Sequence, residues 1–197
     1  MSVHSSSVRR SSTWSRTPSS PVRYVRCVGP IILNSPLARD IACLLDLDPT
    51  VSSWTCRTFS FSQSYDNHKP DIVAERDNDI LVIDAVAKAP PPTWIADAVR
   101  DQGYSYRAMT RGDVDPTQLK NAKDLLRYSG TDVGLGDRVR LLAGLEEHGS
   151  LPVSECLSAF RETPPIAGLA SLVLQRIVEI DLDSLIGPET QVRRFRG

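Results

Sequence analysis

Asp71, Asp84 and Lys88 are the residues whose types and spacing best fit hydrolytic chemistry. Asp84 interrupts an apolar run from Ile80 to Ala87, where a carboxylate is costly unless hydrogen bonds or a bound cation compensate it. Two carboxylates can hold Mg²⁺ through oxygen, and the metal polarises a scissile phosphate and lowers the pKa of an attacking water. A lysine beside them would orient that water and offset developing negative charge.

The elements that must position these residues form a predicted β-hairpin over residues 71–88, with a polar turn at 75–79. Strand alternation places Asp84 and Lys88 on one face, and Asp71 lies across the hairpin from Asp84. A second interpretation stays open from spacing alone. In it, Asp71 only stabilises a turn after Pro70, Asp84 is a structural hydrogen-bond acceptor, and Lys88 is a solvated residue at a strand end.

Helices and strands are expected on both sides of this hairpin. Ser35-Pro36 is a helix start, and Asp48-Pro49 ends that helix. The alternation of these elements predicts an α/β fold, a mixed sheet flanked by helices. The other expected elements are a strand over 51–62, a helix over 93–102, a strand over 104–110 and a helix over 116–128.

A glycine-rich linker, with Gly130, Gly134 and Gly136, separates this core from a C-terminal module. Its order of short helices followed by a two-stranded wing is typical of a winged helix. The helix in the DNA-reading position, 164–176, carries only Arg176 as a cation, which favours a buried structural or protein-docking helix. The predicted organisation is a disordered basic arm (1–28), a core (29–129) and a winged-helix-like domain (130–197). The module's expected elements are helices over 137–148, 153–160 and 164–176, and strands over 177–182 and 190–195.

The net charge of -1 hides an uneven distribution. Residues 1–28 carry +5, residues 191–197 carry +3, and the segment between them carries -9. Basic ends bind phosphate backbones or acidic partner surfaces, although a solvated tail explains them equally well. The candidate DNA-binding residues are Arg9, Arg10, Arg16, Arg193, Arg194 and Arg196.

Four cysteines without a CxxC pair, and three histidines, give no zinc pattern and favour reduced, mostly buried thiols in a cytoplasmic protein. The longest apolar stretch without charge, 163–175, is too short to span a bilayer, so no membrane association is expected. The Arg- and Ser-rich start leaves an organelle transit peptide as an alternative on composition.

Several motifs, in this order along the chain, resemble the TnsA-type endonuclease subunit of heteromeric transposases, within the PD-(D/E)xK restriction-endonuclease-like superfamily. The resemblance covers about 29–195. It implies a restriction-endonuclease-like core that cleaves DNA at transposon ends with magnesium or manganese, in partnership with a DDE transposase and a regulatory ATPase, on the nucleoid. The metal-binding aspartates would be Asp71 and Asp84. The motifs are SPLARDIACLLDLDPTV (35–51), HKPDIV (68–73), ILVIDAVAK (80–88), YSYRAMTRGDV (104–114) and DLDSLIGPETQVRR (181–194).

Two positions depart from the pattern of that family. Ala38 stands where the family has a glutamate on the first helix, and Asp40, the alternative helix acid, is turned about 200° away around the axis. The lysine expected at Val86 is found at Lys88, about 6–7 Å further along a strand. Three hypotheses follow: an active endonuclease subunit, a catalytically inactive subunit that bridges DNA and transposition proteins, and a DNA-binding regulator whose sheet domain scaffolds dimerisation.

Overall fold

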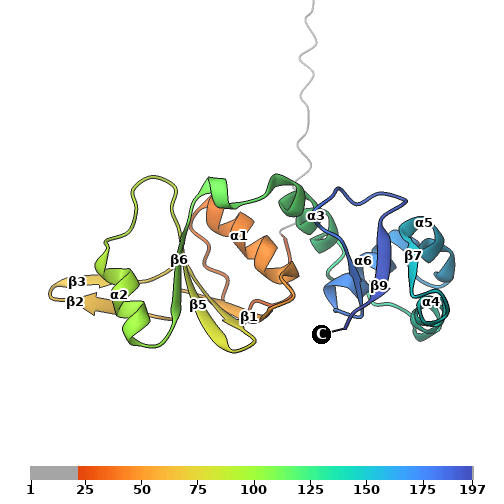
Figure 1. Cartoon of the computed structure of the whole chain (residues 1–197), viewed down its shortest axis with the longest axis horizontal. Helices are drawn as coiled ribbons and strands as arrows, with labels where there is room; N and C mark the ends of the chain where they lie inside the picture. The colour runs from red at the N-terminus through yellow and green to blue at the C-terminus, as the bar shows by residue number, and fades with distance from the viewer. Residues whose placement is uncertain (1–21, 197) are drawn as a thin grey trace, which may run out of the picture.

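The computed structural model describes residues 22–196, so Arg9, Arg10 and Arg16 lie outside the described residues. The described chain forms two bodies that lie next to each other along the long axis (Figure 1). The first body contains α1 (Pro36–Leu47), β1 (Val51–Cys56), β2 (Phe61–Gln63), β3 (Asp66–His68), β4 (Ile72–Arg76), β5 (Asp79–Ala85), α2 (Trp94–Asp101), β6 (Ser105–Met109), the 3₁₀ turn η1 (Arg111–Asp113) and α3 (Pro116–Leu126).

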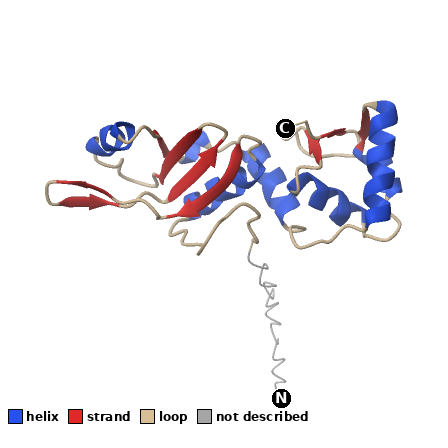
Figure 2. Ribbon diagram, turned by 90° about the horizontal axis from the view of Figure 1, so that it is seen from below, coloured by secondary structure: helices blue, strands red, loops and turns tan. Residues whose placement is uncertain are grey.

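A four-stranded mixed sheet forms the centre of the first body, in the order β1-β4-β5-β6. β1, β4 and β5 are antiparallel neighbours, and β6 is parallel to β5 because α2 carries the chain back across the sheet. Helices flank the sheet (Figure 2). Leu81 and Ile83 pack in the same cluster as α1, whereas Val82 packs with Ile95 and Val99 of α2, so the two helices cover opposite faces. The predicted mixed sheet flanked by helices is confirmed.

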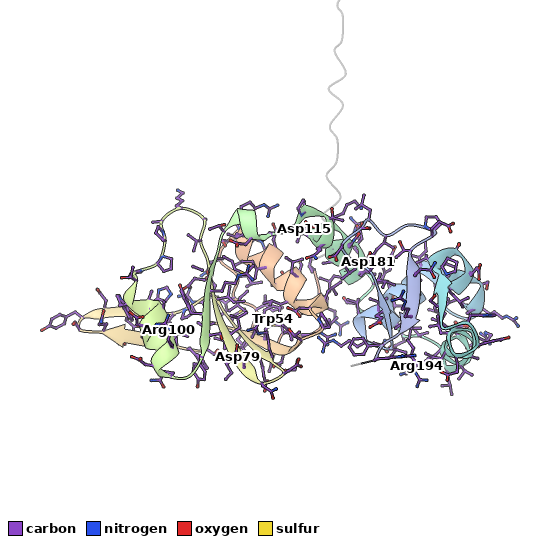
Figure 3. The ribbon with its side chains drawn as sticks, viewed as in Figure 1. Trp54, Asp79, Arg100, Asp115, Asp181 and Arg194 are labelled. Atoms are coloured by element: carbon purple, nitrogen blue, oxygen red, sulfur yellow. The ribbon has the colours of Figure 1, made fainter. Side chains whose placement is uncertain are left out.

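The first helix begins and ends as its sequence predicts. The Ser35 hydroxyl accepts a hydrogen bond from the Ala38 amide at 3.0 Å, Pro36 follows as the first helical residue, and the helix ends at Leu47. Its buried face, with Leu37, Ile41 and Leu45, packs on the sheet. At the centre of this body, the fully buried Trp54 donates its indole N–H to Asp46 at 2.7 Å (Figure 3).

The predicted strand over 51–62 is wrong in its length. Arg57 adopts a left-handed conformation (φ 53°), which ends β1 at Cys56, and its amide donates to the carbonyl of Asp71. The chain then leaves the sheet and forms a separate hairpin of β2 and β3, with Phe61 paired to His68. The predicted hairpin at 71–88 is present but shorter, because β5 ends at Ala85.

The second body contains α4 (Leu135–His148), β7 (Ser150–Pro152), α5 (Val153–Cys156), the 3₁₀ turn η2 (Leu157–Ala159), α6 (Pro165–Leu174), β8 (Val178–Ile180) and β9 (Gln191–Arg194). Its helices and the last two strands agree with the sequence prediction. The sheet, however, has three antiparallel strands in the order β7-β9-β8, because Ser150–Pro152 adds a strand that the sequence analysis missed.

The helix α6 is shared between the two bodies. Ala170 and Leu174 belong to the core cluster of the first body, and Leu169 and Leu172 belong to that of the second. The prediction that this helix is buried is confirmed.

The segment 22–28, expected as part of the basic arm, lies against the free edge of β1. Cys27 forms a parallel bridge with Trp54, and the Tyr24 ring packs edge-on against the Trp54 indole at 5.1 Å. Among the described residues, no helix combines the length and apolar character needed to cross a membrane.

Candidate active site

Asp84 is the second-last residue of β5 and is only 6% exposed. Its Oδ2 atom accepts hydrogen bonds from the Tyr106 hydroxyl at 2.7 Å and from His68 Nε2 at 2.8 Å. Tyr106 comes from the neighbouring strand β6, and His68 from the end of β3. These two donors offset the cost of burying the carboxylate.

Burial, followed by the hydrogen bond from its hydroxyl to Asp84 and the negative charge of that carboxylate, raises the pKa of Tyr106 far above its ordinary value. Tyr106 therefore stays protonated and acts as a donor. Because an ionised carboxylate can only accept, His68 must carry its proton on Nε2, which leaves Nδ1 for another partner.

Asp71 lies immediately before β4, at the side of Asp84. Its Oδ2 atom accepts a hydrogen bond at 3.0 Å from the amide of Ala85, the residue that follows Asp84. The pairing of Ile72 with Ile83 in the hairpin explains this, because it sets the residues before β4 opposite those at the end of β5. The structure thus brings together the two aspartates that the sequence singled out.

Lys88 does not lie on the face of β5 that carries Asp84. The strand ends at Ala85, so the alternation that predicted a shared face is wrong at this position. Lys88 lies in the exposed loop between β5 and α2 and forms no ion pair with any described residue.

Asp40 is also not joined to the aspartate pair. Its carboxylate forms ion pairs with Arg111 and with Lys123, at 2.6 Å for the latter. Although partial burial acts in the opposite direction, these hydrogen bonds and charges lower the pKa of Asp40. Asp40 therefore ties α1 to α3 and the 3₁₀ turn η1.

The aspartate pair could bind a divalent cation, but it would supply few protein ligands. Oδ1 of Asp71 and Oδ1 of Asp84 accept no hydrogen bond from the described residues, so each remains able to bind a cation. Mg²⁺ is commonly held by one or two carboxylates and completed by water. Within residues 22–196, no group of three or more His, Cys, Asp or Glu side chains is arranged to hold a metal.

The sequence analysis assigned no role to His68 or Tyr106, although both lie in the quoted motifs. Tyr106 could have been found from alternation, because the parallel strands β5 and β6 pair Val82 with Tyr106 and so place that ring on the face of Asp84. The contact of His68 depends on the hairpin of β2 and β3, which the sequence did not predict.

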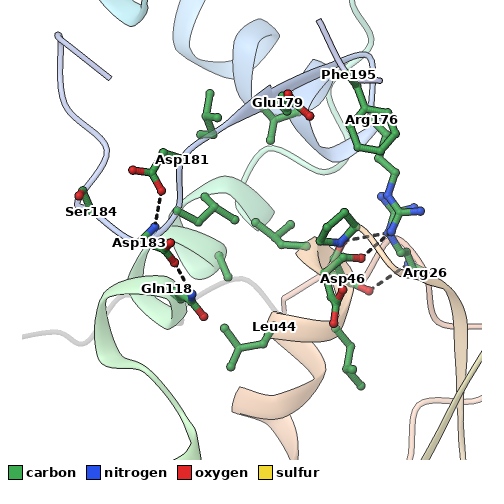
Figure 4. A pocket seen from close by; sticks show the side chains of 18 of the residues that line it. Arg26, Leu44, Asp46, Gln118, Arg176, Glu179, Asp181, Asp183, Ser184 and Phe195 are labelled. Carbon is green, nitrogen blue, oxygen red and sulfur yellow. Dashed lines mark hydrogen bonds between the residues drawn. The ribbon is translucent and has the colours of Figure 1, made fainter. Parts of the chain in front are cut away.

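A cleft of about 1190 Å³ lies between the two bodies and is separate from the aspartate pair (Figure 4). Two arginines bind backbone carbonyls across its walls. Arg26 donates to the carbonyls of Asp46 (2.9 Å) and Leu174 (3.1 Å), and Arg176 donates to those of Asp48 (2.6 Å) and Val51. These contacts make the cleft the junction of the two bodies.

The C-terminal arginines and α6 are the described parts of the second body for which DNA contacts were considered. Arg193 and Arg196 are exposed, while Arg194 forms an ion pair with Glu146 at 3.1 Å. Most of α6 is buried, with Ile166 exposed near its start. This helix therefore offers little surface for reading DNA.

All four cysteines are free, as expected for reduced thiols. Burial raises the pKa of the Cys43 thiol to about 11, and that of Cys156 to about 11, so these residues provide no nucleophile near neutral pH.

The chain matches no protein-family model, and no curated protein matches it.

Proposed function

We propose that this chain is a TnsA-like subunit of a DNA transposition machinery, with a restriction-endonuclease-like core and a winged-helix-like C-terminal module. In this role it cleaves DNA at transposon ends together with a DDE transposase. The observation that carries the proposal is the hydrogen bond from the Ala85 amide to Asp71, which sets Asp71 beside Asp84 at the ends of adjacent strands. The ordered motifs of the sequence support the same assignment.

In the proposed reaction, Asp71 and Asp84 would hold Mg²⁺ or Mn²⁺ through carboxylate oxygen. The bound metal would polarise the scissile phosphate and supply a water of lowered pKa. Tyr106 and His68 fix the Asp84 carboxylate by binding Oδ2, so Oδ1 is held in one orientation. The site is asymmetric, because Asp71 is fixed by a backbone amide whereas Asp84 is fixed by side chains.

The test is a nicking assay on transposon-end DNA with the partner transposase, in Mg²⁺ and separately in Mn²⁺. Asp84→Asn preserves the size of the side chain and should abolish cleavage. Asp79→Asn is the matched control, because Asp79 also lies on β5 but pairs with Arg76 at 2.8 Å, away from Asp84. The absence of cleavage by the wild-type protein with its partner, in both metals, would refute the proposal.

A second candidate is a catalytically inactive subunit that bridges DNA and transposition proteins. It is favoured by the position of Lys88 outside β5, and by the two donors that already engage Asp84 Oδ2. This candidate predicts that the Asp84→Asn protein still co-purifies with the transposase and that wild type does not cleave. Loss of any stable complex would count against it. The third hypothesis, a DNA-binding regulator, is weakened by the burial of α6.

A further inference from the structure

The hairpin of β2 and β3 projects from the first body (Figure 1). Tyr65 lies in the turn between β2 and β3 and has a relative exposure of 105%, so its ring packs on no described residue. The base of the hairpin is anchored, because Phe61 is buried against Val82 and α2. The hydroxyl of Ser60 also donates to the Asn67 side chain at 2.7 Å.

This hairpin connects directly to the aspartate pair. His68, its last residue, contacts Asp84, and Tyr65 at the tip lies three positions before His68. At about 3.4 Å per residue the tip lies about 10 Å from His68, which is the length of about three stacked nucleotides.

Backbone strain is concentrated at the same hairpin. Three non-glycine residues among those described have a positive φ. Two of them are Arg57 (53°), which follows β1 and precedes the hairpin, and Ser64 (55°), which follows β2. Such conformations persist only where surrounding contacts hold them, and they cluster at functional sites. The amide of Arg57, which donates to the Asp71 carbonyl at 3.2 Å, is one such contact.

Three cations lie at or close in the sequence to residues that contact the aspartate pair: Arg57, Lys69 and Lys88. Arg57 is bonded to Asp71 through its amide, Lys69 follows His68, and Lys88 comes three residues after Ala85. None of the three forms an ion pair within residues 22–196. These cations are therefore open to an external anion.

We propose that the β2–β3 hairpin and these three cations form the binding surface for a single DNA strand. Arg57, Lys69 and Lys88 bind its phosphates, and Tyr65 stacks on an unpaired base. Stacking on an exposed ring needs a base whose face is free, so the surface favours a single strand over an intact duplex. The inference rests on the proposed function in taking DNA as the ligand, but it does not require that the site cleaves.

The test measures binding of the full chain to a labelled oligothymidylate and to a duplex of equal length, by fluorescence anisotropy in EDTA over a series of salt concentrations. Tyr65→Ala should weaken binding to the single strand on the order of tenfold, and Tyr65→Phe should not. The triple variant Arg57→Asn, Lys69→Gln, Lys88→Gln should lower the salt slope by about 2, since each phosphate contact contributes about 0.7. Asparagine is used at position 57 because it tolerates a left-handed backbone.

The matched control removes three exposed cations from other places: Arg23→Gln, Arg138→Gln and Arg161→Gln. It should leave the salt slope unchanged. Equal loss in both triple variants, or wild-type binding by Tyr65→Ala, would overturn the proposal. The proposal would also be overturned if the single-stranded DNA does not bind, but the transposase binds and Tyr65→Ala weakens that binding. The surface would then be a protein interface. Tyr65-dependent binding of the strand without any nicking would leave this proposal standing and refute cleavage alone.

Discussion

The Tyr106 hydroxyl donates to Asp84 Oδ2 at 2.7 Å, so a side-chain hydrogen bond joins β5 and β6 beside the backbone bonds of their parallel pairing. Tyr106→Phe removes this donor and leaves a buried carboxylate oxygen with one partner fewer. The free energy of unfolding should fall by about 1–2 kcal/mol, measured by urea denaturation. Tyr104→Phe is the control, because the Tyr104 ring stacks on Phe59 and its hydroxyl has no partner among the described residues. Equal losses in both variants would contradict the special role of the Asp84 contact.

The junction of the two bodies should be sensitive to Arg176. Arg176→Met keeps an aliphatic stem but removes the donors to the carbonyls of Asp48 and Val51. The Asp48 carbonyl would keep its bond from the Val51 amide at 3.1 Å. Losing the two guanidinium bonds should still destabilise the protein by about 2 kcal/mol, measured as a shift of the urea midpoint at constant slope. Arg193→Met, at an exposed position of β9, should change the midpoint little. A midpoint for the Arg176 variant that matches wild type would show that water replaces the guanidinium without loss.

Gly168 in α6 has no room for a side chain. A Cβ atom there would overlap the ring of Phe160, and it would lie 3.3 Å from a methyl carbon of Thr163. Gly168→Ala should therefore cost about 1–3 kcal/mol, despite the better helix propensity of alanine. Gly112→Ala, whose Cβ would have only the Thr110 hydroxyl at 3.7 Å nearby, should be nearly neutral. Thermal unfolding of both variants checks this, and a Gly168→Ala protein as stable as wild type would show that Phe160 moves freely.

Asp137 should make the stability of the protein fall in acid. Burial acts to raise the pKa of Asp137, but the amides of Arg161, Thr163 and Glu162 bond to its carboxylate and hold that pKa well below its usual range. A lowered folded-state pKa gives stability that is complete above the unfolded value near 4 and is lost as the pH falls toward the folded value. Urea midpoints at pH 7, 4 and 2.5 should drop steeply below pH 4 for wild type. Asp137→Asn should be less stable at pH 7 and should show a flatter profile, so parallel profiles would contradict the assignment.

The sequence predicted most elements because local signals and tertiary contacts agree in them. In α1, the cap at Ser35, the proline at the first helical position and the apolar spacing all indicate one helix, and each has its expected partner in the structure. The position of Asp71 beside Asp84 was predictable for a related reason, because a hairpin of two apolar strands with a polar turn fixes which residues face each other.

The remaining features depend on contacts that no local pattern encodes. Arginine is not a residue that favours a left-handed backbone, so the end of β1 at Cys56, and hence the β2–β3 hairpin, left no signal in the sequence. The end of β5 at Ala85 was missed because the apolar run continues through Val86 and Ala87. The strand β7 was missed because Ser150–Pro152 is short and contains a proline, which is typical of an edge strand.

Because α6 packs its side chains into both hydrophobic clusters, the two bodies should not melt one after the other. A chain that ends at residue 129 would lose Ala170 and Leu174 from beneath α3 and would expose the apolar surface they cover. The glycine-rich stretch from Gly130 to Gly136 therefore connects the two bodies, but cutting the chain there should not give two independently folded fragments. A destabilising substitution in one body should also destabilise the other. Fragments separated at this linker would expose apolar surface and are expected to aggregate.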